Sequence, residues 1–282
     1  MILFISRAPS FSPGNVEKDA RILDLTARRL RDSGQETVLL DEDTFVSKHW
    51  EGETPRRVFS MGRKLATLMR LEQYGWDCVN APQAVRNTAL SRELTLMLLQ
   101  SNSIAVPAWW AYEPEEDELF QCEPRLQELL PGWVKVMRPD GVTSSDVTFV
   151  ATPLEADTAV ITRTAEGVTD LVVTRHLEGD LLKVYAVTDG ESLTFFRRFS
   201  PREEGYTKFG NECHNSPHRG YAADEEALRT LALHIARVLG LQVFGFDVLL
   251  SATGEPTVID VNDWPSFSRF AEEAAAAIAA LA

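Results

Sequence analysis

The sequence predicts a mixed fold, with an α/β arrangement at its start and an α+β arrangement afterwards. Strand and helix patterns alternate up to about residue 82, whereas several strands follow one another in series beyond it. Alternation is typical of a parallel sheet, and strands in series with little helix between them indicate an α+β arrangement. At 282 residues the chain also exceeds the usual size of one domain, so we expect two or three small domains that share one cleft.

The first 82 residues are expected to form a small α/β domain around a parallel sheet. Residues 1–5 (MILFI) read as a strand, and a Ser/Pro/Gly loop leads from it into a helix that begins near Asn15. Apolar residues of this helix recur at spacings of three and four and make one stripe, namely Val16, Ala20, Leu23, Ala27 and Leu30. Further strands are expected over 37–40, 57–61 and 77–80, with a helix over 63–73.

The rest of the chain predicts a helix over 88–101 and then strands with little helix between them. These strands are expected at 133–137, 147–151, 171–177, 181–187 and 193–199. A long helix over 224–239, a hairpin, and an Ala-rich helix over roughly 269–281 complete the chain.

Charge and hydropathy exclude two classes of partner. With 42 acidic and 28 basic residues the net charge is −14, which repels a phosphate backbone and attracts divalent cations. No apolar run approaches the roughly 18 residues that a membrane helix needs, and MILFISRAPS is too short in apolar residues for a signal peptide. We therefore expect neither a nucleic-acid nor a membrane partner.

The cysteines indicate a reducing compartment. They are odd in number and far apart, which argues against a disulfide framework. The three are Cys78, Cys122 and Cys213. We expect a cytoplasmic protein.

Familiar phosphate-binding and hydrolase motifs are missing from the sequence. It contains no GxxxxGK[ST], no GxGxxG after a strand and no GxSxG. Any nucleotide chemistry must therefore use other residues.

Polar residues interrupt two apolar runs that flank a short Gly-containing turn, VFGFDVLL (243–250) and PTVIDVN (256–262). Alternation along the second strand sends Asp260 and Asn262 to one face, and antiparallel pairing brings Asp247 near them. Oxygen ligands of this kind suit Mg²⁺ or Mn²⁺. Strand ends that simply face water are the alternative, but Asp247 lies inside an apolar run, where an unpaired carboxylate is costly.

From about residue 78 the chain resembles the ATP-grasp superfamily, whose two α+β subdomains hold ATP between them. The set Asp247, Asp260 and Asn262 matches the metal ligands of that superfamily. Lys135 in WVKVMRPDGVTSSD (133–146) matches a strand lysine followed by a flexible Gly-containing loop over the phosphates, and Arg92 matches a basic residue on an earlier helix. The resemblance implies an acceptor-binding domain over 1–82, a central subdomain over 83–177 and a carboxyl-terminal subdomain over 178–282.

The resemblance also implies nucleotide contacts around VTRHLEGD (173–180). Backbone groups of Arg175, His176 and Leu177 would contact the adenine, and Glu178 or Asp180 would reach the ribose. Among the basic residues of the next two strands, Lys183 and either Arg197 or Arg198 match groups that act on the phosphates.

Transfer of the γ-phosphoryl group from ATP to a small-molecule acceptor is the implied reaction, and two reaction classes stay open. In a carboxylate–amine ligase, a carboxylate becomes an acylphosphate that an amine attacks. In a small-molecule kinase, as in the inositol phosphate kinases, the phosphate stays on the acceptor. The segments GFDVLL and IDVNDW are similar to sequence motifs of those kinases. A kinase for a polyphosphorylated acceptor would need a dense basic pocket, whereas the bases of the amino-terminal domain are scattered. The ligase interpretation is therefore narrowly preferred. A non-enzymatic nucleotide sensor is a third, weaker interpretation.

The loop SRAPSFSPGN (6–15) ends at a helix N-terminus, where backbone N–H groups favour an anion. One hypothesis is that Arg7, Ser10, Ser12 and Asn15 bind a phosphate or carboxylate of the acceptor, with Ser266 lining the same pocket. A plain surface loop is an equal alternative. Homodimers are common in this fold, so a dimer is also expected to be possible.

Overall fold

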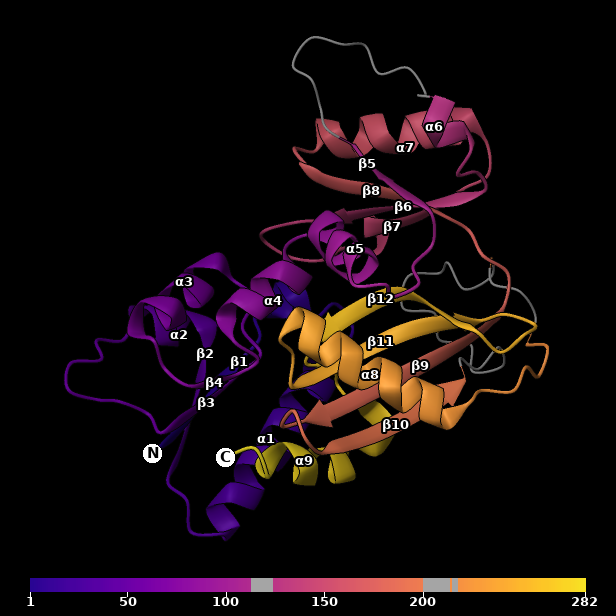
Figure 1. Ribbon diagram of the computed structural model, residues 1–282. Helices are drawn as coiled ribbons and strands as arrows, with labels where there is room; N and C mark the ends of the chain where they lie inside the picture. Colours follow the sequence, from indigo (N-terminus) through magenta and orange to yellow (C-terminus); the bar gives the residue numbers. More distant parts are fainter. Residues whose placement is uncertain (113–123, 200–213, 215–217) are drawn as a thin grey trace.

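The computed structural model describes residues 1–112, 124–199, 214 and 218–282 of the chain (Figure 1). Within these residues the strands form three four-stranded sheets, one parallel and two antiparallel. The predicted mixed fold is thus confirmed. Cys122 and Cys213 lie outside the described residues. In the described part, no helix is both long and apolar enough to cross a bilayer.

The amino-terminal sheet is parallel, with strand order β2-β1-β3-β4. Its strands are β1 (Ile2–Ser6), β2 (Thr37–Asp41), β3 (Arg57–Ser60) and β4 (Cys78–Val79), and its helices are α1 (Val16–Asp32), α2 (Glu42–Ser47) and α3 (Leu65–Tyr74). The expected stripe of α1 is buried at Leu23, Ala27 and Leu30. Helix α2 was not expected; it starts directly after β2 because the Asp41 side chain accepts from the Thr44 N–H, 2.8 Å.

The central sheet is antiparallel, with strand order β5-β8-β6-β7. It consists of β5 (Trp109–Ala111), β6 (Gly132–Met137), β7 (Val147–Val150) and β8 (Asp170–Arg175), with α6 (Pro124–Gln127) and α7 (Pro153–Ala165) packed on it. Helix α7 corrects the expectation of little helix in this region. Its start carries a clear signal, since Thr152 and Glu155 form a capping box around Pro153.

Two helices replace the single one expected over 88–101. They are α4 (Pro82–Ala89) and α5 (Arg92–Ser101). Ser91 separates them, because its hydroxyl accepts from the Leu94 N–H at 3.1 Å and so starts a new helix.

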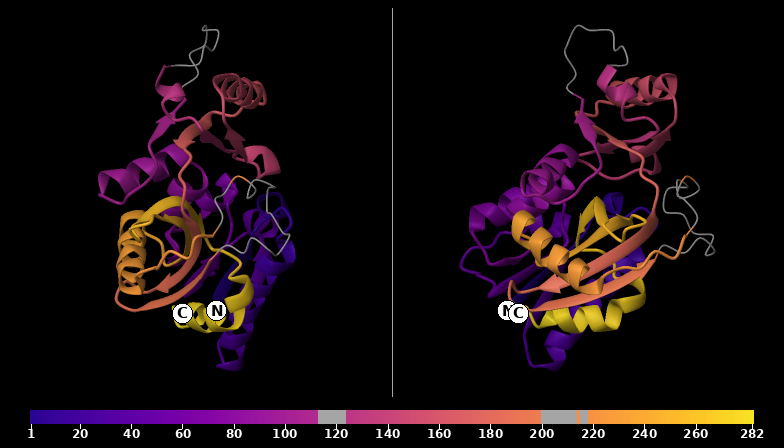
Figure 2. Two further views of the ribbon diagram at one scale, coloured as in Figure 1. Left: turned by 90° about the vertical axis from the view of Figure 1, so that its right-hand side faces the viewer. Right: turned by 45° about the vertical axis from the view of Figure 1, so that its right-hand side comes forward.

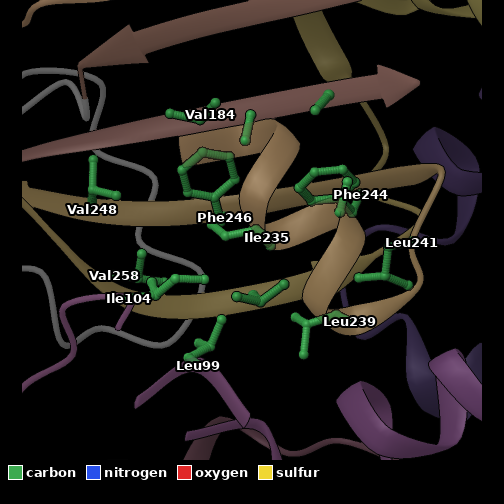
Figure 3. Close-up of a cluster of buried hydrophobic side chains, with 14 of the residues drawn as sticks. Leu99, Ile104, Val184, Ile235, Leu239, Leu241, Phe244, Phe246, Val248 and Val258 are labelled. Carbon is green, nitrogen blue, oxygen red and sulfur yellow. The ribbon is translucent and has the colours of Figure 1, made fainter. Parts of the chain in front are cut away.

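The carboxyl-terminal sheet is antiparallel, with strand order β10-β9-β11-β12. Its strands are β9 (Asp180–Thr188), β10 (Leu193–Phe199), β11 (Val243–Leu250) and β12 (Pro256–Asp263), followed by α9 (Ala271–Ala279). Helix α8 (Glu225–Leu239) covers one face, and Figure 3 shows Phe244 and Phe246 of β11 against Ile235 of that helix. In both views of Figure 2, α9 in yellow lies beside α1 in indigo.

The hydrophobic clusters cross the domain boundaries expected at 82 and 177. One cluster joins Phe4 and Phe59 of the amino-terminal sheet to Trp264 and α9. Another joins Leu99 and Ile104 to α8. The amino-terminal domain therefore shares a core with the carboxyl-terminal subdomain, and α5 packs on α8 as well as on the central sheet; the boundaries themselves stay a prediction.

Candidate active site

Four charged residues form one row across the carboxyl-terminal sheet. Strand pairing places Arg198 opposite Lys183, Lys183 opposite Asp247, and Asp247 opposite Asp260. Directly paired residues of antiparallel strands point to the same face. The row therefore presents two cations and two carboxylates on the face that α8 does not cover.

The next row of the same face adds Asn262, as strand alternation predicts. Its side-chain Nδ2 donates to Asp260 Oδ2 at 2.7 Å, which leaves its amide oxygen as an acceptor. Two carboxylates and an amide oxygen on adjacent strands are a donor set for a hard divalent cation. The described residues contain no group of three or more His, Cys, Asp or Glu able to hold a metal ion.

The carboxylates of the row pair with one basic group of the same sheet and one of helix α5. Lys183 Nζ lies 2.9 Å from Asp247 Oδ2, and the charge of Asp247 raises the pKa of Lys183. The Arg92 guanidinium, from the first turn of α5, pairs with Asp260. The predicted phosphate and metal residues are thus brought together by the fold.

Lys135 of the central sheet reaches the same place from the other side. Its ammonium donates to the main-chain oxygen of Ile259 at 2.7 Å, and burial lowers the pKa of Lys135 to about 8 although Asp260 partly opposes the shift. Around Lys135 lies a small hollow between the central sheet, α5 and β12, which we call the intersheet hollow. It is lined by Arg92, Thr95, Leu96, Leu99, Lys135, Val172 and residues 258–261.

The two neighbouring arginines of β10 point to opposite faces. Arg198 shares the face of Lys183, and its Nε is buried without a hydrogen-bond partner among the described residues. Arg197 pairs with Val184 on the α8 face, where its guanidinium lies 3.3 Å from the Glu225 carboxylate. Of the two, only Arg198 lies beside the metal-binding candidates, and we no longer assign Arg197 a catalytic role.

At the expected adenine hinge, two main-chain donors are already used inside the protein. The N–H of Arg175 donates to Ala108 O and the N–H of His176 to Pro131 O, both at 2.8 Å. The indole of Trp133 donates to His176 Nδ1 at 3.0 Å, and burial lowers the pKa of His176. A base at this hinge would have to use the carbonyl groups here or the backbone of half-buried Leu177.

The two acids expected near the ribose differ in availability. Asp180 is 1% exposed, and its carboxylate accepts from the N–H groups of Arg219 and Tyr221 at 2.6 and 2.7 Å. Asp180 therefore anchors the chain before α8, which corrects its expected role at the ribose. Glu178 is exposed and lies 2.6 Å from the Arg219 guanidinium.

Arg7 is a structural residue, in contrast to the expected acceptor contact. Its guanidinium donates to the main-chain oxygens of Met61, Asp263 and Trp264 at 3.0 to 3.2 Å. It also pairs with Asp19 at 3.1 Å, and only 7% of its side chain is exposed. Because its donors are used in these contacts, Arg7 connects the end of β12 to the amino-terminal domain and is not available to bind an acceptor.

The remaining acceptor candidates lie on two turns. Ser12 is buried and donates to Asp19 Oδ2 at 2.6 Å, so it too is structural. Ser10 is exposed and Asn15 is half-buried, and Ser10 O accepts from the N–H of Val142 at 2.9 Å. Half-buried Ser266 pairs with Ser268, 3.1 Å apart.

Two acids around the site, buried Asp263 and half-buried Asp170, gave no motif in the sequence. Asp263 is 1% exposed and pairs with Arg63 as well as Arg7. Asp170 contacts the start of α5. Their partners lie far away in the sequence, so no local motif marks them. The one signal in the sequence is their position at the end of an apolar strand, where a carboxylate that becomes buried needs a partner.

Comparisons with known proteins place the fold. The sequence matches no family model and no curated protein. D-alanyl-alanine synthetase A from Vibrio cholerae is similar in structure, with a TM-score of 0.69, 14% identity and coverage of 96% of this chain and 90% of that chain. D-alanine–D-alanine ligase from Bacillus anthracis complexed with ATP has a TM-score of 0.67 and 15% identity, with coverage of 98% of this chain and 91% of that chain. A RimK domain ATP-grasp protein from Sphaerobacter thermophilus has a TM-score of 0.66 and 18% identity, with coverage of 100% of this chain and 99% of that chain.

Proposed function

We propose that the chain, which has the ATP-grasp fold, is an ATP-dependent carboxylate–amine ligase that acts through an acylphosphate. The observation that carries this proposal is the charged row of β9 to β12 facing Lys135 and Arg92. The proteins it resembles include ligases by name, and one of them is complexed with ATP.

The charges of the site suit a nucleotide triphosphate. Arg92, Lys135, Lys183 and Arg198 supply four basic groups against the carboxylates of Asp247 and Asp260, on a protein whose net charge is −14. Such a local excess of cations needs an anion to balance it, and phosphoryl transfer depends mainly on positioning and charge neutralisation. Lys135 and Arg92 would bind the phosphates from one side and Lys183 and Arg198 from the other.

Magnesium fits the oxygen set of Asp247, Asp260 and Asn262. Bound there, the ion would neutralise phosphate charge and orient the γ-phosphoryl group. Asp247 pairs with Lys183 and Asp260 pairs with Arg92, so both carboxylates are held in the interface between the sheets. When phosphates arrive, both basic groups have new oxygens to bind within reach of the same sheet.

The proposed reaction has two steps. A carboxylate oxygen of the acceptor attacks the γ-phosphorus, and ADP leaves with the electron pair of the broken P–O bond. An amine nitrogen then attacks the acyl carbon, so that inorganic phosphate leaves and the nitrogen gives up a proton. The four basic groups stabilise charge in the first step.

The amino-terminal domain favours a ligase over a kinase. A polyphosphorylated acceptor needs several unpaired cations, but Arg7 and Arg63 are paired with Asp19 and Asp263. Both guanidiniums are largely buried and also donate to main-chain oxygens, so they are committed to the fold. A small acceptor with few negative charges suits this surface better. The cytoplasmic location and the homodimer stay predictions.

The test follows the label from γ-labelled ATP. The protein is incubated with Mg²⁺, labelled ATP and a protein-free metabolite extract, and Asp260→Ala serves as the control. We expect extract-dependent release of labelled inorganic phosphate by the intact protein alone. Label that stays on an organic acceptor would establish the kinase alternative, and equal release by the variant would remove the proposed site.

A further inference from the structure

We propose that Asp170 is a positioning residue that holds Arg92 on the phosphates of ATP. This inference rests on the proposed function, because it concerns how one basic group of the ATP site is aimed. Asp170 is the first residue of β8 and belongs to none of the motifs in the sequence.

The contacts of Asp170 all go to the start of α5. Its Oδ1 accepts from the main-chain N–H of Arg92 at 2.9 Å, and its Oδ2 accepts from the Ser91 hydroxyl at 2.6 Å. The same Ser91 hydroxyl accepts from the Leu94 N–H and caps the helix. Asp170 therefore fixes both the backbone of Arg92 and the residue before it.

Electrostatics explain why an acid is needed at this position. Arg92 is the first residue of α5, where the partial positive charge of the helix end disfavours a cation. Asp170 adds a negative charge at the same helix end, and Asp260 pairs with the guanidinium. Without Asp170 the first turn would lose the acceptor of the Arg92 N–H and of the Ser91 hydroxyl, and only Asp260 would then hold the guanidinium in place, so we expect Arg92 to move away from the site.

Asp170 also fixes Arg92 relative to Lys135. Within the central sheet Asp170 pairs with Met137, and Val172 pairs with Lys135, so that Asp170 and Lys135 share one face two residues apart along the strands. Arg92 and Lys135 both line the intersheet hollow. The buried Nε of Arg92 has no hydrogen-bond partner among the described residues.

A double-mutant cycle tests this assignment with a non-hydrolysable ATP analogue and Mg²⁺ as the probe. The Kd is measured for the intact protein, Asp170→Ala, Arg92→Ala and the double variant, and the melting temperature of each is recorded. We expect Asp170→Ala to raise the Kd by about tenfold. In the Arg92→Ala background the same change should raise the Kd no further, although it should still lower the melting temperature.

A matched control separates positioning from stability. Asp224 caps α8 through the N–H groups of Glu226 and Ala227, so Asp224→Ala removes a similar carboxylate cap outside the site. It should lower the melting temperature and leave the Kd unchanged. An unchanged Kd in Asp170→Ala, or equal effects of Asp170→Ala in both backgrounds, would overturn the inference. If Arg92→Ala alone has no effect, the inference also falls, whereas Lys135→Ala still tests the ATP site separately.

Discussion

Lys135 and Ile259 connect the two sheets that face each other in the site. The Lys135 ammonium donates to the main-chain oxygen of Ile259 at 2.7 Å. Ile259 is the extra residue of a β-bulge, because Asp247 pairs with Asp260 whereas the next residue, Val248, pairs with Val258. A bulge re-aims the groups of its strand, and here it turns a carbonyl toward the lysine while Asp260 stays in the charged row.

The first prediction concerns pH. Burial lowers the pKa of Lys135 from its model-compound value of 10.5 to about 8, so the ammonium is charged below that pH and loses its proton above it. We expect ATP affinity to be highest below about pH 8 and to fall as pH rises, by at most about tenfold per pH unit. Nucleotide titrations across this range measure the effect.

Lys135→Arg is the control for this pH dependence, since arginine keeps its charge throughout. Its affinity for ATP should be flat over the same range. A fall of equal size in both proteins would assign the titration to another group.

The second prediction concerns the carboxylates of the row. Asp247→Asn and Asp260→Asn keep the shape of the side chains but remove a negative charge that the metal ion needs. We expect each variant to lose at least about 100-fold in Mg²⁺-dependent turnover while its circular dichroism spectrum is kept. Full activity of both variants would end the metal assignment.

The third prediction uses the adjacent arginines of β10 as a matched pair. Arg198→Ala removes a cation beside Lys183, whereas Arg197→Ala removes a half-exposed ion pair with Glu225 on the α8 face. We expect about a tenfold or larger loss of turnover in the first variant and almost none in the second. Similar losses of turnover in both variants would show that the effect of these arginines does not depend on the face of β10 to which they point.

The fourth prediction concerns the loop after β6. A Cβ on Gly141 would lie 2.8 Å from Ser10 O and 3.1 Å from Ser10 Cβ, so Gly141→Ala must push this loop away from the amino-terminal domain. Because the loop would lie over the phosphates, bound nucleotide should leave faster. Stopped-flow release of a fluorescent ATP analogue measures this rate, and Asp140→Ala, which adds no Cβ clash, should leave it unchanged.

The fifth prediction separates the structural role of Arg7 from acceptor binding. Arg7→Met leaves the buried carboxylates of Asp19 and Asp263 with less compensation. We expect the free energy of unfolding to fall by about 3 kcal/mol in urea titrations. The exposed Ser10→Ala change should cost little stability, so a comparable loss there would contradict this account.

Local patterns in the sequence predicted the mixed fold class and the placement of the three candidate metal ligands. Alternation along β12 and the short turn before it correctly placed Asp260 and Asn262 on one face with Asp247 opposite. The parallel sheet at the start and the α+β arrangement of the remainder were also predicted, because hydrophobic periodicity and connection length decide them locally. Helix α7 was not predicted, although its capping box and the proline at its start are helix-start signals present in the sequence.

Tertiary structure alone decided which basic and acidic groups remain available for a ligand. Nothing local distinguishes Arg197 from Arg198, or a buried Arg7 from an exposed one; strand register and the packing of α8 and β12 do. Asp180 and Asp170 likewise gain their partners from residues 39 to 79 positions away. Periodicity fixes the face of a side chain, but its partner comes from another element. The sequence therefore determined the mixed fold and the face shared by Asp247, Asp260 and Asn262, while long-range packing determined the partners of the surrounding charges.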